Sequence, residues 1–374
     1  MQLLAVELSD FRNVANALVE PHPRFNVLAG DNGQGKTNFL EAVYLVGTLR
    51  SFRAGRLDEL VRFGAKSPGG PARASARVER NGLSRRYDVE VWASPARKRA
   101  LVDGKPVRAA AEYFGGFNVV LFAPDDLRLP RGQPAARRRF LDRAVWNVEP
   151  ALLAEAQTYE RALKARNTLL RTGEAQRDPA LLESFDEPLA RAGASLAVRR
   201  RRYVSAIAPR VQAAFEQIGR SGLAVEVRYE SAIGGLASSP SESEPIAEEL
   251  RALLRRARPR DLAAGFTTAG PHTDDLELLL DGRPAGRFAS QGQLRALVLA
   301  LKVAEIGHLA AVSGEPPVLL LDDVSSELDP SRNAFLFEFL RAATGQVFIT
   351  TTDPRHVLLD RDRRDFHVRG GIVC

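Results

Sequence analysis

Cysteine is almost absent from this chain: among its 374 residues the only one is Cys374. A disulfide within the chain is therefore impossible, and such a composition is typical of a reducing compartment. The five histidines are scattered without metal-ligand spacing, so we expect no structural zinc site. These absences exclude the disulfide-rich secreted scaffolds and the small zinc-stabilised domains.

The sequence also shows no targeting segment. Asp10, Arg12 and Asn13 interrupt the N-terminal region too early for a signal peptide. A helix that crosses a bilayer needs about 20 apolar residues, and we expect that no stretch of this sequence meets that requirement. The sequence therefore predicts a soluble, cytoplasmic protein.

Lysine is scarce among the basic residues. Of 53 Lys and Arg only six are Lys, which leaves 53 − 6 = 47 Arg, and the formal net charge is +7. The guanidinium fork suits phosphate groups, but an arginine excess can equally reflect the base composition of a genome. The charge is thus compatible with nucleic acid without requiring it. With 45% hydrophobic residues, the composition is globular and predicts one large domain or two moderate ones.

The two ends of the chain show the pattern of an α/β domain. Short strands are expected at residues 3–8 and 25–28, followed by a helix over 38–49 whose apolar residues have helical spacing. Residues 72–107 alternate as antiparallel strands do, with turns at Asn81-Gly82 and Asp103-Gly104. Buried strands return at 276–280, 318–321 and 346–350.

The middle of the chain has a different character. Residues 135–218 are rich in Ala, Arg, Leu and Glu at helical spacing, and 246–257 continue that pattern. A strand is expected at 225–230 and a flexible surface loop at 234–245. Sustained heptads are absent, so a long coiled-coil arm is not expected. The sequence predicts one α/β domain that carries a mostly helical insertion.

A glycine-rich loop follows the strand at 25–28 and precedes a helix. Its glycines let the backbone wrap a phosphate chain, while Lys36 can reach the outer phosphates and the Thr37 hydroxyl can ligate Mg²⁺. The alternative is a glycine-rich turn with a solvated lysine, which the strand-loop-helix context disfavours. The residues of the loop are Gly30, Asp31, Asn32, Gly33, Gln34, Gly35, Lys36 and Thr37.

The apolar strand at 318–321 ends in two carboxylates, Asp322 and Asp323. Asp322 can hold the Mg²⁺ shell, as in other phosphate-loop enzymes. Successive strand residues point in opposite directions, so Asp323 is assigned a different task, the positioning or deprotonation of a water near the γ-phosphate. Many strands end in Asp, so this motif alone is weak evidence. It indicates a nucleotide site only in combination with the glycine-rich loop.

Ser290-Gln291-Gly292-Gln293 begins an apolar helix that runs to about Val312. Ser290 and Gln293 have the spacing of a capping box, which by itself explains the motif. A helix N-terminus with Ser, Gly and bare N–H groups is also a phosphate site. The motif precedes the acidic strand, where a signature loop is expected.

Four motifs occur in the order found in ATP-binding-cassette ATPases: the glycine-rich loop, the Ser290 helix start, the acidic strand end and Ser326-Glu327-Leu328-Asp329. The opening Phe11-Arg12-Asn13 resembles the start of the SMC-like branch, which includes DNA-repair ATPases. Within that branch the chain resembles the RecF family, and its short insertion favours that family over SMC proteins with long arms. The supporting stretches are residues 50–53, 122–127, 137–142, 270–276 and 290–295.

The resemblance implies an ABC-type P-loop ATPase head, built from residues 1–124 and 265–374 (lobe I), with a helical inserted lobe at 125–264 (lobe II). It implies ATP and Mg²⁺ as ligands and a head-to-tail homodimer with ATP between the protomers. Each nucleotide would contact Lys36 and Thr37 of one protomer and Ser290 of the partner subunit. Asp329 would line the same interface. Arg12 and Asn13 are further candidate contacts near the nucleotide.

The resemblance also implies a biological role. RecF-like proteins bind double-stranded DNA and single/double-strand junctions with RecR and RecO, help RecA load onto single-stranded DNA, and hydrolyse ATP slowly with DNA stimulation. Three arginine clusters are candidate phosphate contacts, although such runs are usually solvated helix faces. They are Arg137 to Arg139, Arg199 to Arg202, and Arg255, Arg256, Arg258 and Arg260.

The sequence departs from the cassette pattern at three places. Asp323 stands where many cassette ATPases have Glu, and its shorter reach fits a slow hydrolase. Thr352 or Asp353 must replace the usual His, and Asp125 or Asp126 lies near the position of the usual Gln. His272 precedes two acids, but such a residue more often caps a turn.

Other classes of protein share some of these motifs. A transporter ATPase subunit has them all but normally keeps the missing His. A small-molecule kinase needs no Ser290 motif. A degenerate nucleotide-binding module without hydrolysis also fits the loop and the acidic strand.

Overall fold

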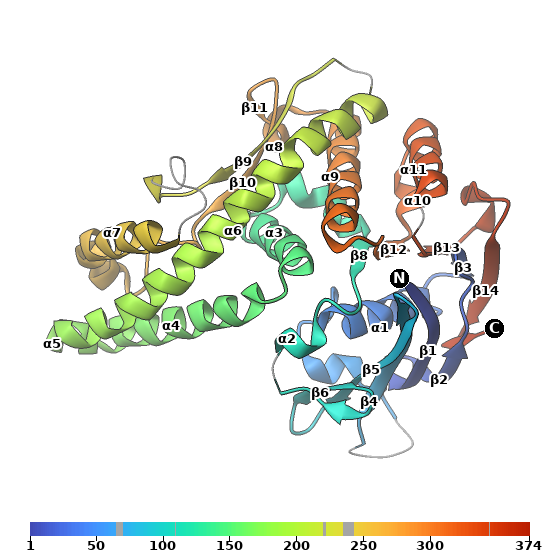
Figure 1. Cartoon of the computed structure of the whole chain (residues 1–374), viewed down its shortest axis with the longest axis horizontal. Helices are drawn as coiled ribbons and strands as arrows, with labels where there is room; N and C mark the ends of the chain where they lie inside the picture. Colours follow the sequence, from blue (N-terminus) through green and yellow to red (C-terminus); the bar gives the residue numbers. More distant parts are fainter. Residues whose placement is uncertain (65–69, 109, 220–221, 235–242, 344) are drawn as a thin grey trace. The chain divides into compact units, whose positions relative to one another are not determined.

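The computed structural model describes residues 1–64, 70–108, 110–219, 222–234, 243–343 and 345–374 (Figure 1). The chain forms two compact units, of which unit 1 comprises Met1–Leu127 and Ile306–Cys374 and unit 2 comprises Arg128–Glu305. Most of the loop expected at 234–245 lies outside the described residues. Each unit has its own hydrophobic core and is described separately.

Unit 1 contains an antiparallel sheet of order β2-β1-β4-β5-β6-β7. Two of its hairpins turn at Asn81-Gly82 (φ 50° and 74°) and Asp103-Gly104 (φ 50° and 77°). Positive φ at both central residues defines the tight turn that matches strand twist, so both predicted turns are confirmed. The strands are β1 (Gln2–Phe11), β2 (Val14–Val19), β4 (Ala72–Arg80), β5 (Leu83–Trp92), β6 (Arg97–Val102) and β7 (Lys105–Pro106).

The second sheet of unit 1 has the order β15-β14-β3-β13-β12-β8, and the strands from β14 to β8 are parallel. Strands β3, β13, β12 and β8 are buried along their whole length, which explains their continuous apolar sequences. The carboxyl ends of parallel strands share one edge, and that edge carries the site. The strands are β3 (Phe25–Ala29), β8 (Val119–Phe122), β12 (Val318–Asp322), β13 (Val347–Thr351), β14 (Arg363–Arg369) and β15 (Ile372–Val373).

The principal helix of unit 1 is α1 (Lys36–Thr48), which starts directly after the glycine-rich loop. Phe39, Leu40 and Val43 of this helix are buried in the core. The helix ends at Leu49, whose φ of 54° places it in the left-handed region of a C-cap. The other helices are α2 (Ala110–Tyr113), α10 (Val324–Glu327), α11 (Pro330–Ala342) and the 3₁₀ turns Leu57–Leu60, Pro124–Arg131 and Pro354–His356.

Unit 2 is mostly helical, as predicted, with a small antiparallel sheet of order β11-β10-β9. Helix α6, of 41 residues, packs along α4 and α7 (Figure 1). Its elements are α3 (Pro134–Val148), α4 (Leu152–Thr172), α5 (Glu174–Arg177), α6 (Pro179–Gly219), β9 (Val225–Glu230), α7 (Ser243–Ala264), β10 (Asp275–Leu280), β11 (Arg283–Pro284), α8 (Ala285–Phe288) and the first part of α9 (Gln291–Ser313).

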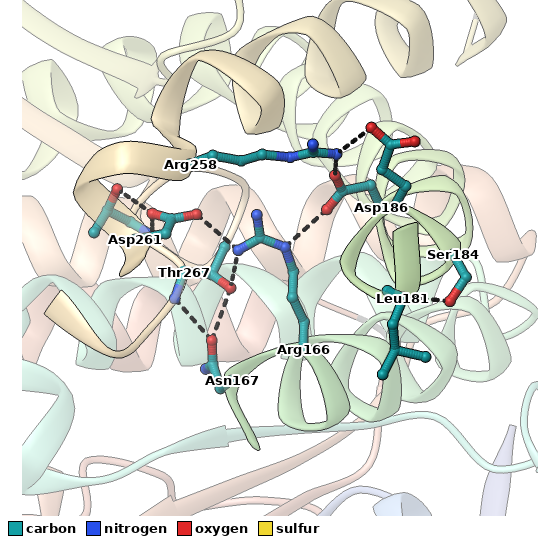
Figure 2. A network of polar contacts seen from close by, with 10 residues as sticks. Arg166, Asn167, Leu181, Ser184, Asp186, Arg258, Asp261 and Thr267 are labelled. Carbon is teal, nitrogen blue, oxygen red and sulfur yellow. Dashed lines mark hydrogen bonds and ion pairs between the residues drawn. The ribbon is translucent and has the colours of Figure 1, made fainter. Parts of the chain in front are cut away.

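A fully buried arginine ties three of these helices together. Arg166 of α4 donates from Nε to Asp186 of α6 at 2.8 Å and from Nη1 to Asp261 of α7 at 2.7 Å (Figure 2). Arg258 donates to the other carboxylate oxygen of Asp186 at 3.0 Å. A buried charge is stable only when it is paired and hydrogen-bonded, and two aspartates meet that need here.

The second boundary between the units differs from the one expected. Residues 265–305 belong to unit 2, because β10 pairs with β9 over six residues and the buried face of α9 joins the same core. The sequence placed them in lobe I, since strand β10 resembles the strands of an α/β domain. The first boundary lies at Leu127, three residues after the expected residue 124.

One expectation about apolar stretches was wrong. Helix α9 has 23 residues and is long and apolar enough to cross a membrane by length and composition. A helix at the core of a globular unit passes the same test. Leu294, Leu297 and Leu301 of α9 are buried in the core of unit 2, which accounts for its composition.

Candidate functional site

Three neighbouring parallel strands end at the site. Strand β3 leads into the glycine-rich loop, β13 ends with Thr350 and Thr351, and β12, which pairs with β13, ends with Asp322. The sheet therefore brings together residues from the two ends of the chain. The sequence predicted that the loop and the acidic strand belong to one site, and the strand order brings them to the same edge of the sheet.

The glycine-rich loop needs backbone conformations that only glycine adopts readily. Gly33 has φ 78° and Gly35 has φ 113°, and the helix α1 begins at the next residue, Lys36. The Lys36 Nζ group donates to the carbonyl oxygens of Gly30 at 2.6 Å and Asp31 at 2.8 Å. The backbone of the loop thus surrounds the Lys36 ammonium group. Burial lowers the pKa of Lys36, against the opposing effect of Asp323, Asp322 and Asp31.

Thr37 and Asp322 are joined directly. The Thr37 Oγ1 hydroxyl donates to Asp322 Oδ1 at 2.8 Å, and Thr350 Oγ1 donates to the same oxygen at 2.8 Å. Hydroxyl and carboxylate oxygens are the ligands that Mg²⁺ prefers. Thr37 and Asp322 are therefore of the chemical type that would hold a magnesium ion, and this assignment stays a prediction.

Thr350 also fixes Asp323. Its Oγ1 accepts a hydrogen bond of 2.9 Å from the Asp323 N–H, and Asp323 has a φ of 51°. This left-handed backbone is unusual for a residue other than glycine, and it turns the chain from β12 into α10. This role could not be predicted, because in the sequence Thr350 has only the features of a β-branched strand residue.

The carboxylate of Asp323 lies in an environment that disfavours its charge. Its Oδ1 is buried and has no hydrogen-bond partner. Burial, together with the nearby Asp322 and Glu327 carboxylates, raises the pKa of Asp323 against the lowering effect of Ser326 and Lys36. A carboxylate with a raised pKa and a free acceptor oxygen has the properties of a general base, which agrees with the task assigned to Asp323.

Arg12 acts on α1 and not on the loop itself. Its Nε and Nη2 donate to the two carboxylate oxygens of Glu41 at 2.8 and 2.7 Å, and its Nη1 donates to the Glu59 carbonyl at 2.8 Å. Glu41 is fully buried and also accepts from the Ser51 hydroxyl. Arg12 is therefore a positioning residue in this structure. Glu41 was missed, because a single acid within an apolar helix resembles a surface residue.

Asn13 contacts the glycine-rich loop directly. Its Nδ2 donates to the Gln34 carbonyl at 3.1 Å, and its Oδ1 accepts from Asn38 of α1 at 2.8 Å. A Cβ on Gly35 would lie 2.7 Å from Asn13 Oδ1, so the side chain occupies the space that this glycine leaves. Asn13 supports the loop from outside.

The segment that starts with Ser290 forms the expected capping box. The Ser290 N–H donates to Gln293 Oε1 at 2.7 Å, and the Gln293 N–H donates to Ser290 Oγ at 3.2 Å. Ser290 and Gln291 are exposed, so the helix start is accessible on unit 2. A phosphate that bound here would meet the N-terminal end of α9 with Gly292 in its first turn.

Asp329 caps helix α11. It accepts hydrogen bonds from the Arg332 N–H at 3.2 Å and the Ser331 hydroxyl at 2.8 Å, and it pairs with the Arg332 guanidinium. Burial alone would raise its pKa, but these partners lower the pKa of Asp329 to about 2. In the single chain the Asp329 carboxylate thus accepts the N-cap hydrogen bond of α11.

The candidate replacements for the usual Gln and His have local partners. Asp126 is buried and accepts from the Ala123 N–H at 3.0 Å, whereas Asp125 is exposed. Asp353 caps the turn Pro354–His356 and pairs with Arg355, and Thr352 is exposed. Of these four residues, Thr352 and Asp125 present exposed side chains.

His272 has a structural environment in unit 2. Its Nδ1 lies 2.6 Å from the Tyr159 hydroxyl and its Nε2 lies 2.9 Å from the Thr267 carbonyl. Because a carbonyl can only accept, Nε2 carries the proton and Nδ1 accepts from the tyrosine. Burial lowers the pKa of His272, which favours this neutral form.

The arginine clusters divide into paired and exposed members. Arg137 pairs with Asp275, Arg200 is buried against Asp142, and Arg258 pairs with Glu183 and Asp186. Arg138 donates to the Asp274 carbonyl and Arg199 pairs with Glu149. The exposed members are Arg139, Arg202, Arg255, Arg256 and Arg260, and of these Arg202 also lies 3.9 Å from Glu149.

Comparison with known proteins decides the family. The model of the RecF/RecN/SMC N-terminal domain matches residues 2–363 of this chain. A DNA replication and repair protein RecF of Anaeromyxobacter dehalogenans (strain 2CP-C) is 49% identical over 379 residues, covering 100% of this chain and 99% of that protein. This chain belongs to the RecF family.

Other RecF proteins and solved structures agree. The DNA replication and repair protein RecF of Myxococcus xanthus (strain DK1622) is 47% identical, covering 94% of this chain and 91% of that protein. A solved structure of the recombination mediator protein RecF with ATP, in the RecFOR pathway, has 30% identity and a TM-score of 0.87 and covers 100% of this chain and 98% of that one. An SMC head bound to a winged-helix domain of ScpA, at 15% identity and a TM-score of 0.55, shares the fold.

These matches confirm the predicted fold class, an SMC-like ATPase head with a helical lobe. Membership of the RecF family also separates this chain from the two rival classes, a transporter ATPase subunit and a small-molecule kinase. Proteins of the RecF family act in DNA replication and repair.

Proposed function

We propose that this chain is a cytoplasmic, ATP-dependent DNA-binding protein of recombinational repair. ATP closes a head-to-tail homodimer on duplex DNA near single/double-strand junctions, and hydrolysis releases it. With RecO and RecR it helps RecA load onto single-stranded DNA. The observation that carries the proposal is the joining of the glycine-rich loop to the acidic strand through Thr37 and Asp322 at 2.8 Å. Membership of the RecF family supplies the biological role.

The residues of unit 1 divide the work on ATP. The loop from Gly30 to Thr37 binds the phosphates through its N–H groups, and the Lys36 ammonium moves from the Gly30 and Asp31 carbonyls to the outer phosphates. Thr37 and Asp322 hold Mg²⁺, which neutralises charge on the phosphates when it is bound. Asp323 orients the attacking water and accepts its proton through the oxygen that has no other partner.

Slow hydrolysis agrees with this division of work. Asp323 has a shorter side chain than the Glu usual at this position, so its carboxylate reaches less far toward the γ-phosphate. Its backbone is fixed by Thr350, which prevents the main chain from closing that gap. A slow hydrolase suits a switch, in which the ATP-bound dimer must persist on DNA.

The dimer would complete the nucleotide site. Ser290 and Gln291, at the start of α9 in unit 2, are exposed. In the head-to-tail arrangement they would face the nucleotide held by the partner subunit, and Asp329 would line the interface. The Ser290–Gln293 capping box keeps this helix start in a fixed conformation for that contact.

Two measurements test the proposal together. Light scattering after gel filtration, with and without ATP, should show a monomer that becomes a dimer, and Lys36→Ala should remain monomeric. DNA binding should require ATP and should be stronger for duplex and gapped substrates than for single strands. A chain that stays monomeric in saturating ATP, or binds DNA equally well without it, contradicts the switch.

A further inference from the structure

The glycine-rich loop has neighbours on two sides, and only those on one side have a role in the proposed ATP site. One side faces Asp322 and Thr350, which the chemistry uses. The other side faces the turn Gly370-Gly371 between β14 and β15, which no motif assigned to the site includes. Strand β14 pairs in parallel with β3, so this turn lies beside the loop at the same edge of the sheet.

The turn holds Gln34, at the centre of the loop, by two hydrogen bonds. The Gly371 N–H donates to the Gln34 carbonyl at 2.8 Å, and the Gly370 N–H donates to Gln34 Oε1 at 2.7 Å. Asn13 donates to the same Gln34 carbonyl at 3.1 Å. Three donors from two distant segments therefore fix one residue of the phosphate loop. The Gln34 side chain points toward the turn.

The packing around these contacts leaves no space for a side chain at Gly371 or at Gly30. A Cβ on Gly371 would lie 2.3 Å from the Asn13 carbonyl oxygen, and a Cβ on Gly30 would lie 2.3 Å from the Val368 carbonyl oxygen. Real Cβ atoms do not approach backbone atoms so closely. The loop, the β1–β2 turn and the C-terminal turn thus fit together through glycines that face neighbouring backbone.

The energetics favour a role in nucleotide binding. A phosphate loop must hold several N–H groups toward the same anion, and a loop that is free to move loses conformational entropy when it binds. Contacts that fix the loop before binding reduce that cost. The two-residue turn of a hairpin normally faces solvent. Here both N–H groups of the turn instead donate hydrogen bonds to Gln34.

We propose that the C-terminal hairpin β14–β15 is a positioning element for ATP binding, in which Gly370 and Gly371 clamp Gln34 and hold the phosphate loop in its binding conformation. The inference rests on the proposed ATP site and assigns to it a segment beyond its sequence motifs. The hairpin acts on the affinity for ATP and not on the hydrolysis step, because its turn contacts Gln34 and not the catalytic candidate Asp323.

Two glycines in two-residue turns provide a matched pair of variants. Gly371→Ala introduces the clash with Asn13, whereas Gly82→Ala, in the β4–β5 turn away from the proposed site, meets no atom within 4 Å. Both glycines have positive φ, 83° and 74°, so both variants add similar backbone strain. Gln34→Ala removes only the acceptor for Gly370 and keeps the loop backbone, and it serves if Gly371→Ala does not fold.

The experiment measures the Kd of the full chain for fluorescent MgATP, with KM, kcat and the melting temperature. Gly371→Ala should raise Kd and KM by roughly tenfold, and Gln34→Ala by about fivefold, as expected for one lost hydrogen bond. Gly82→Ala should stay within about twofold of wild type, and kcat at saturating ATP should change little in all three. A merely destabilised protein would instead melt earlier and bind with an unchanged Kd.

The controls separate this inference from the proposed function. If wild type binds ATP and Lys36→Ala does not, the ATP site stands. If Gly371→Ala and Gln34→Ala then bind ATP as tightly as Gly82→Ala, the clamp is overturned. If wild type itself fails to bind ATP, the proposed function falls instead.

Discussion

Thr37 and Asp322 are 285 positions apart in the sequence, yet the hydroxyl of one donates to the carboxylate of the other at 2.8 Å. The contact exists because β13 lies between β3 and β12 in the parallel sheet, so that the ends of these strands meet at one edge. In the proposed function, magnesium binding and hydrolysis both depend on this contact.

Removal of the Thr37 hydroxyl should weaken magnesium binding. Thr37→Val keeps the shape of the side chain but loses the ligand, so the Mg²⁺ concentration for half-maximal hydrolysis should rise by about tenfold or more. Thr37→Ser keeps the hydroxyl and should behave like wild type. A Mg²⁺ titration of ATP hydrolysis measures the effect, and an unchanged midpoint in the valine variant contradicts the assignment.

Thr350→Val should slow hydrolysis more than it weakens ATP binding. The variant removes one donor to Asp322 and leaves the Asp323 N–H without its acceptor, so the left-handed turn at Asp323 is no longer fixed. The loss of this contact should lower kcat by roughly tenfold with a small change in KM. Thr350→Ser retains the hydroxyl and should restore kcat. Equal kcat values for the valine and serine variants would show that Thr350 has no positioning role.

The rate of hydrolysis should fall with decreasing pH earlier than an ordinary aspartate would cause. Because burial raises the pKa of Asp323, its carboxylate takes up a proton at a higher pH and the base is lost there. The profile of kcat/KM against pH reports the groups of the free enzyme. ATP affinity measured over the same range provides the control. A rate that stays level until ordinary aspartates protonate rules out Asp323 as the base.

Arg12→Ala should destabilise the folded protein. The variant leaves the fully buried Glu41 carboxylate without its bidentate partner, a change that costs about 3 kcal/mol or more. Arg56 also pairs with an acid, Asp58, but its side chain is 77% exposed, so Arg56→Ala should cost less than about 1 kcal/mol. Urea unfolding of both variants measures the difference. Similar midpoints for the two would refute a structural role for the Arg12–Glu41 pair.

Of the three arginine clusters, the one on α7 keeps the most exposed side chains, Arg255, Arg256 and Arg260. If these contact DNA phosphates, the double variant Arg255→Ala with Arg256→Ala should reduce the slope of log affinity against log salt by roughly 2. Arg258→Ala, which breaks internal pairs, should change stability more than this slope. Binding of duplex DNA over a salt series checks the prediction, and an unaltered slope excludes this cluster.

Local sequence determined the elements and the loop chemistry of this protein. The alternation of residues 72–107 and the Asn-Gly and Asp-Gly pairs are sufficient for the hairpins, because turn type depends on two adjacent residues. The spacing of glycines before Lys36 defines a phosphate loop in the same way, and the Ser290–Gln293 spacing gave the observed capping box. These features involve residues close in the chain, so their physical causes are visible in the sequence.

Tertiary structure decided everything that depends on which distant residues meet. The strand order placed Thr350 beside Asp322 and Asp323, within hydrogen-bonding distance of both. It also placed the Gly370-Gly371 turn beside Gln34. The pairing of β10 with β9 assigned residues 265–305 to unit 2 although their strand pattern suits either unit. A strand pattern shows that a residue is buried or exposed, but hydrogen bonding between strands selects its neighbours. For that reason the phosphate loop could be found from the sequence, while the residues that hold it in place could not.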